Sequence, residues 1–261
     1  MRSPTATSMS PSSSFSSLSS IVASPLPPTL TNATSAPMAT MVPSMVWPFL
    51  KRFDLVDASN NAAKSSSISL TTRSSSMLSA MSMMFSCERE EGVAVLRLEH
   101  GKVNAMDLPL CEALTKQLGV LAADSCEAVV LTGAGNSFCA GVDLVRLAKG
   151  GPEYVKHFLL AMDTLFHTLL TFPKPMVAAL NGHALAGGCI IAACCDHVVM
   201  ADGQRRVGVT ELAVGVPFPM LPLEIVRARV TERDGRDLAY SARTLLPAEA
   251  MVMGLVDQVV P

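Results

Sequence analysis

The pattern of apolar and polar positions divides the chain into an unpatterned N-terminal segment and a patterned remainder. Residues 1–86 show no sustained apolar period of 2 or 3.6 residues, whereas short apolar runs alternate with stretches of helical spacing from residue 91 onward. This alternation is typical of an α/β domain with mostly parallel strands. We therefore expect a domain boundary near residue 86, followed by a folded domain over residues 87–261.

Two kinds of apolar pattern locate the elements of that domain. Period-2 or continuously apolar runs bounded by turn residues predict strands, and spacing of three and four residues predicts helices. The predicted strands cover 92–98, 128–132, 176–180 and 197–201. The predicted helices cover 108–121, 153–171, 189–195, 223–230 and 247–253.

Residues 1–86 differ from the rest in composition as well as in pattern. They hold 24 of the 27 serines, with five basic side chains against two acids. So little patterned apolar surface predicts disorder. Two interpretations remain open. The segment is either an organelle transit peptide, which would place the protein in mitochondria, or upstream sequence before a true start among Met77, Met81, Met83 and Met84, which would leave it cytoplasmic.

Charge and apolar runs argue against two classes of partner. A formal net charge of −2, from 20 basic and 22 acidic residues, gives no reason to expect nucleic acid or an anionic membrane surface as a partner. Residues 176–195 are uncharged and nearly long enough to span a bilayer, yet Asn181, His183 and three glycines interrupt them. We expect no membrane span.

Cysteine spacing indicates neither a metal site nor a disulfide framework. All seven cysteines lie beyond residue 86; none form a C-x-x-C pair, and no histidine stands at zinc-finger spacing. We expect free thiols in a reducing compartment and no bound metal.

Two glycine-containing turns, residues 136–144 and 181–189, each follow a predicted buried strand. Small residues let main-chain N–H groups approach a ligand, and the second turn also opens a helix, where free N–H groups favour negative charge. Two converging N–H groups would form an oxyanion hole for a thioester carbonyl becoming an enolate. Taken alone, either turn is more often explained by tight packing.

Taken together, the two turns resemble the signature of the enoyl-CoA hydratase/isomerase (crotonase) family. The first reads F-C-A-G-V-D-L over 138–144, and the second is part of P-K-P-M-V-A-A-L-N-G-H-A-L-A-G-G over 173–188. Residues 102–106 and 245–257 are also similar to the family. The resemblance implies an α/β crotonase-like superhelix of repeated ββα units. It also implies an acyl-CoA substrate in fatty-acid metabolism, with no cofactor besides the CoA of the substrate.

The resemblance assigns roles to individual positions. The oxyanion-hole N–H groups would be those of Val142 and Gly187. Substrate or CoA contacts would come from Lys102, Val103, Asn104, Ala105, Ala140, Gly141, Asp143, Leu144 and Gly188.

The catalytic positions separate two reactions. The family's hydratases use two glutamates; the first position falls here on Ile190 and the second on Glu211. One carboxylate with an oxyanion hole suffices to move a double bond from the 3,4 to the 2,3 position, because only one proton is removed and returned. We therefore predict an enoyl-CoA isomerase, with a hydratase as the alternative. Apart from the resemblance, Glu211 could be a solvated acid at a helix start.

Family members normally continue beyond the position of Pro261 into helices that cover the acyl pocket and form trimer contacts. We accordingly expect the C-terminal helices to be truncated here, and a homo-oligomer, trimer or hexamer, only if the C-terminus is complete. A non-catalytic CoA-binding homologue is the alternative from another functional class.

Overall fold

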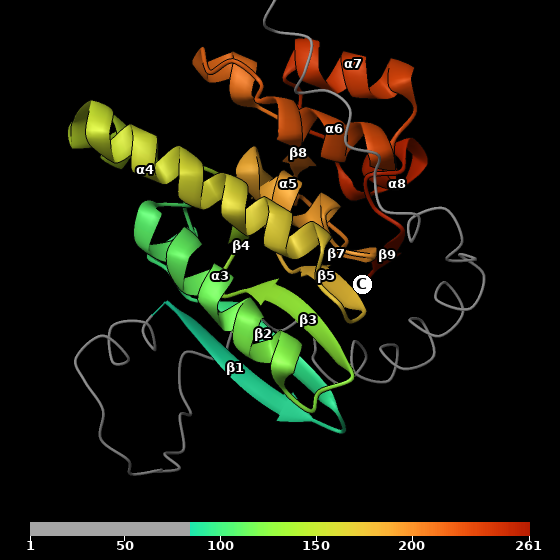
Figure 1. Cartoon of the computed structure of the whole chain (residues 1–261). Coiled ribbons are helices and arrows are strands. Elements are labelled where there is room, and N and C mark those ends of the chain that lie inside the picture. Colours follow the sequence, from blue (N-terminus) through green and yellow to red (C-terminus); the bar gives the residue numbers. More distant parts are fainter. Residues whose placement is uncertain (1–83) are drawn as a thin grey trace, which may run out of the picture. The chain divides into compact units, whose positions relative to one another are not determined.

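The computed structural model describes residues 84–261, which form two β-sheets and the helices that accompany them (Figure 1). The predictions for residues 1–83, including the disorder, the transit peptide and the alternative start, lie outside the described residues. The expected boundary between residues 86 and 87 falls inside the first strand, β1 (Phe85–Glu90). Its sequence, FSCERE, ends in charged residues and only Phe85 is buried, so it lacks the apolar signal of a buried strand.

The larger sheet has six strands in the order β1-β2-β3-β5-β7-β9. All neighbours pair in parallel except β1 and β2, which form an antiparallel hairpin. Four of the strands were predicted from the apolar runs, whereas β1 and β9 were not. Their bounds are β2 Val93–Leu98, β3 Ala128–Gly133, β5 Met176–Leu180, β7 His197–Ala201 and β9 Gln258–Val260.

The smaller sheet has three parallel strands in the order β4-β6-β8. They are β4 (Ser137–Cys139), β6 (His183–Leu185) and β8 (Val207–Gly208). Each follows a long strand of the larger sheet, so the chain repeats a unit of long strand, short strand and helix. This repetition confirms the predicted ββα architecture.

Helices complete the repeats. The first, α3 (Leu108–Ala123), packs against α4 (Leu144–Leu170), and α5 (Gly187–Ala193) packs against α6 (Met220–Arg229). The helix predicted from residue 153 begins at Leu144, because α4 continues through a kink at Gly151, where φ is 73°. After α6 come α7 (Glu232–Ser241) and α8 (Pro247–Met253). The polar α7 was not predicted, because it buries only Gly235 and Leu238.

Both faces of the larger sheet are buried. Alternate residues Leu96, Leu98 and Leu131 join the apolar side chains of α3 in the main core, whereas Val95 and Val130 belong to a second cluster. Side chains in successive strand positions point to opposite faces, so these strands are apolar throughout.

The described residues also bear on two expectations drawn from composition. In residues 84–261, none of the helices is long and apolar enough to cross a membrane. All seven cysteines lie in this part of the chain as free thiols.

Candidate active site

The predicted catalytic positions lie just beyond the ends of the three short strands. Val142 comes three residues after β4, Gly187 two residues after β6 and Glu211 three residues after β8. Since β4, β6 and β8 are adjacent and parallel, their carboxyl ends lie at one edge of the sheet. Ligands of α/β sheets bind at such edges.

The two glycine turns are in direct contact. At Gly141, φ is +86°, and a Cβ there would lie 2.8 Å from both the Ala186 Cβ and the Leu185 carbonyl oxygen. The same Cβ would be 3.3 Å from the Gly187 nitrogen. Only glycine fits at position 141, and its absent side chain brings the main chain around Val142 close to that of Gly187.

The main-chain N–H of Val142 takes no part in the hydrogen bonds that the neighbouring peptides make with Met106. The Met106 N–H donates to the Gly141 carbonyl at 2.7 Å, and the Asp143 N–H donates to the Met106 carbonyl at 2.9 Å. These two bonds make the parallel bridge between Met106 and Val142. Because they use the peptides on either side, the N–H of Val142 itself points away from Met106.

The N–H of Gly187 is one of the unpaired groups at the start of α5. Ala186 precedes it with φ 47° and ψ −124°, a conformation that residues with a Cβ rarely adopt. This ψ sets the plane of the peptide that contains the Gly187 N–H. A first helical residue has no carbonyl in a preceding turn. In residues 84–261, neither the Gly187 nor the Val142 N–H donates a main-chain hydrogen bond.

Glu211 is a buried carboxylic acid at the start of a short 3₁₀ segment, η2 (Glu211–Val214). The residue is only 8% exposed, so the interpretation as a solvated acid is wrong. Its Oε2 atom has no hydrogen-bond partner within the described part of the chain. Burial raises the pKa of Glu211 to about 7, opposed by main-chain hydrogen bonds at Glu211 and Thr210. Such a group can both accept and return a proton near neutral pH.

The position that would supply a second carboxylate is apolar. Ile190 is fully buried in α5 and cannot transfer a proton. Its neighbour Cys189 does not replace a base, because burial, and secondarily the charge of Glu211, raises the pKa of this thiol to about 12. The geometry therefore offers two main-chain donors and one titratable acid.

The residues predicted to contact CoA fall into accessible and buried groups. Lys102, Val103 and Leu144 are exposed, and Ala105, Ala140 and Asp143 are partly exposed. The buried ones are Asn104, Gly141 and Gly188. Contact with CoA stays a prediction for all nine.

Two of the buried positions have a structural role that the sequence did not reveal. Asn104 is 1% exposed, and its side-chain amide donates to the carbonyls of Ser137 and Phe138 at 2.9 and 3.1 Å. A Cβ at Gly188 would lie 2.1 Å from the Cys139 carbonyl oxygen. Asn104 thus holds the loop that contains it against β4, and Gly188 lets the second glycine turn approach β4 closely.

Sequence reasoning missed Asp107, whose buried carboxylate lies between α3 and α4. Its Oδ1 atom accepts the Leu110 N–H at 2.9 Å, and its Oδ2 atom contacts His100 and Arg146. An aspartate directly before Leu108 and Pro109 is a helix N-cap signal that could have identified it.

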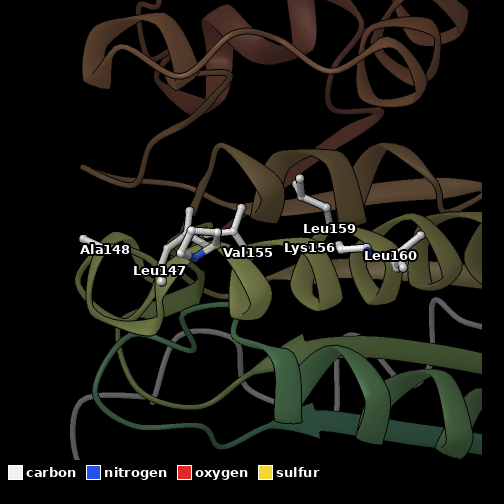
Figure 2. Close-up of a pocket in the computed structure, with 8 residues that line it drawn as sticks. Leu147, Ala148, Val155, Lys156, Leu159 and Leu160 are labelled. Atoms are coloured by element: carbon white, nitrogen blue, oxygen red, sulfur yellow. The ribbon is translucent and has the colours of Figure 1, made fainter.

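A surface groove of about 700 Å³ runs along the exposed side of α4 and is lined mostly by apolar residues (Figure 2). Leu147, Val155, Leu159 and Leu160 line it, together with Gly151 and Pro152 at the kink of the helix. Leu147 is five residues after Val142, so this apolar groove is close in the sequence to the first glycine turn.

Comparisons with known proteins identify the family of this chain. The family model described as enoyl-CoA hydratase/isomerase matches residues 88–261. A putative enoyl-CoA hydratase of Thermus thermophilus is 40% identical over 60% of this chain and 63% of its own length. The mitochondrial enoyl-CoA delta isomerase 1 of Mus musculus is 32% identical over 67% of this chain and 61% of its own length.

Solved structures show the same fold. The crystal structure of an enoyl-CoA hydratase from Bacillus anthracis is similar with a TM-score of 0.65 and 30% identity, over 68% of this chain and 70% of that chain. The present chain spans somewhat over 60% of the length of the two curated relatives above. The match over two thirds of the sequence, and over the elements that form the site, shows that the chain belongs to the enoyl-CoA hydratase/isomerase (crotonase) family.

Proposed function

We propose that this protein moves the double bond of an enoyl-CoA from the 3,4 to the 2,3 position, with Glu211 as its only proton-transfer group. One observation supports this most directly. Glu211 is a buried acid with a pKa of about 7 and with one oxygen that has no hydrogen-bond partner among residues 84–261, while Ile190 occupies the place of a second carboxylate.

The proposed reaction begins with removal of an α-proton. The carboxylate of Glu211 takes the proton from C2, and the electron pair delocalises over the thioester carbonyl and the double bond as a dienolate. The N–H groups of Val142 and Gly187 stabilise the negative oxygen. Glu211 then returns the same proton to C4, which leaves the double bond between C2 and C3. Proton count and charge balance without any other group.

Hydration requires two proton-transfer steps that involve different groups of the substrate and a water. A water must be activated for attack at C3 while C2 receives a proton, and in the family's hydratases two glutamates share this work. The match to a putative hydratase of Thermus thermophilus keeps hydration as the second candidate. With Ile190 fully buried at the first position, we expect hydration to be the slower reaction.

The test supplies 3-enoyl-CoA and 2-enoyl-CoA separately to the full chain and measures isomerisation and hydration. Isomerisation should be the faster reaction. Ile190→Glu adds the missing carboxylate, and Ile190→Gln is its matched control with the same shape and no base. A wild type that hydrates faster than it isomerises would contradict the proposal. Absence of both reactions, with acyl-CoA still bound, would support the non-catalytic alternative.

A further inference from the structure

We infer that Asp107 is a positioning residue that holds the Val142 N–H in place through Arg146. The inference deepens the proposed function, since it concerns the same oxyanion hole. Asp107 lies directly after Met106, and Arg146 lies four residues after Val142. The two side chains therefore join the same two segments that the main chain joins at Met106 and Val142.

The Asp107 carboxylate collects contacts from three segments. Oδ1 accepts the Leu110 N–H at 2.9 Å and caps α3. Oδ2 contacts the Arg146 guanidinium at 2.5 Å and the His100 Nε2 at 3.0 Å. The main-chain N–H of His100 donates to the side-chain oxygen of Asn104 at 2.8 Å. This hydrogen bond stabilises the loop before α3.

Burial makes this contact more than a surface ion pair. The Asp107 side chain is 2% exposed, while those of His100 and Arg146 are 23% and 48% exposed. A buried carboxylate that loses its cationic partner is strongly disfavoured, whereas an exposed pair contributes little. The three groups should therefore remain together in the folded protein.

Arg146 is oriented from its other side as well. Its guanidinium lies over the Tyr154 ring at 5.9 Å from the centroid, and the Tyr154 hydroxyl accepts the Leu108 N–H at 3.2 Å. Arg146 thus links the first turn of α4 to the first turn of α3. This placement favours a scaffold role for Arg146 over a free cation for a phosphate group of CoA.

The consequence concerns the geometry of one donor. An oxyanion-hole N–H acts only when it lies about 2.7–3.1 Å from the developing negative oxygen. The Met106–Val142 bridge and the Asp107–Arg146 pair hold the C-terminal end of the first turn at two points, one before and one after the start of α4. Without the pair, the turn would pivot on the bridge and the Val142 N–H would move from its position.

The decisive variant is Asp107→Asn, since asparagine still caps α3 but no longer pairs with a charge. We expect kcat for isomerisation to fall roughly tenfold, less than the 10²–10³ lost with a whole oxyanion-hole donor, and KM to change little. Bound acetoacetyl-CoA gives an independent readout, because its enolate absorbs in the near ultraviolet. The enolate fraction should fall in Asp107→Asn and equally in Arg146→Met, which leaves the buried carboxylate in place.

The matched control is Asp124→Asn at the opposite end of α3. It breaks the Arg89–Asp124 ion pair of 2.6 Å, and kcat and the enolate fraction should stay at wild-type values. Unchanged enolate in both Asp107→Asn and Arg146→Met would overturn the inference, as would weaker CoA binding by Arg146→Met with no loss of enolate. A wild type that forms no enolate and does not isomerise would instead refute the proposed function.

Discussion

The two sheets of this protein differ in what their strands do. The six-stranded sheet consists mainly of strands of five or six residues whose side chains fill two apolar clusters. The strands of the three-stranded sheet are only two or three residues long, and the segment after each one holds a candidate catalytic group. Most of the buried apolar strand positions thus lie in one sheet, and the candidate catalytic groups lie beside the other.

The difference follows from how each sheet is held. Long strands are stabilised by apolar burial, roughly 25 cal/mol per Å². Four side chains of the short strands, those of Phe138, Cys139, Ala184 and Val207, join the main core as well. These strands are in addition held by close main-chain approaches, such as Gly188 against Cys139, and by buried polar side chains such as Asn104. These contacts fix peptide orientation, which is what an oxyanion hole requires. The comparison predicts that changes in the two regions affect different measurements.

The largest effect should come from Glu211→Gln beside the smaller sheet. A positioned general base typically supplies 10²–10⁴-fold, so kcat for isomerisation should fall by about that factor. Acyl-CoA affinity, measured by calorimetry, should change little because the main-chain donors remain. Glu224→Gln, an exposed glutamate on α6, is the matched control and should keep full activity. A Glu211→Gln variant that isomerises normally would remove Glu211 from the reaction.

The larger sheet should respond in the opposite way. Leu131 is fully buried in β3, and Leu131→Ala should lower the free energy of unfolding by about 2–5 kcal/mol, from lost burial and the resulting cavity. Activity per folded molecule should stay near wild type. Urea unfolding and active-site titration measure the two quantities, and Leu131→Met, which conserves volume, should lower stability by less than about 1.5 kcal/mol. A large loss of kcat in folded Leu131→Ala would break the proposed division.

The same division explains what could be predicted from the sequence. The continuous apolar runs identified β3, β5 and β7 because burial on both faces leaves a strong signal. The short strands leave no periodic signal, and the family resemblance alone pointed to the turns that follow them. Neither pattern nor resemblance could reveal that Glu211 is buried or that Asp107 contacts Arg146, since both facts depend on segments far apart in the chain.

Glu211 should also lower the stability of the protein at high pH. Its pKa of about 7 in the folded state exceeds the ordinary value of 4.5, so the folded state binds the proton more tightly than the unfolded state. Stability should then fall as the pH rises through this window, by roughly 3 kcal/mol in all. Glu211→Gln should be the more stable protein at pH 8, with the difference shrinking towards pH 5. A difference in unfolding free energy that does not depend on pH would contradict the raised pKa.

The smallest expected effect is that of replacing an alanine with a positive φ by glycine, once in the candidate site and once outside it. Ala186, before the Gly187 N–H, and Ala242, at the end of α7, share a positive φ, 47° and 49°. Glycine relieves strain of about 1–2 kcal/mol at such positions but loses about 0.5–1 kcal/mol through the freedom of the unfolded chain. Ala186→Gly and Ala242→Gly should therefore each stabilise the fold by no more than about 1.5 kcal/mol.

Activity should separate these two variants. Ala186 sets the plane of the Gly187 peptide, and glycine would let that N–H sample other directions, so kcat should fall severalfold in Ala186→Gly. Ala242 is the C-cap residue after α7, outside the candidate site, and Ala242→Gly should keep full activity. Thermal unfolding and initial rates on the two proteins measure both expectations. Equal activity in both variants would mean that the Gly187 N–H is held by its contacts with Gly141 and Met106 and not by the conformation of Ala186.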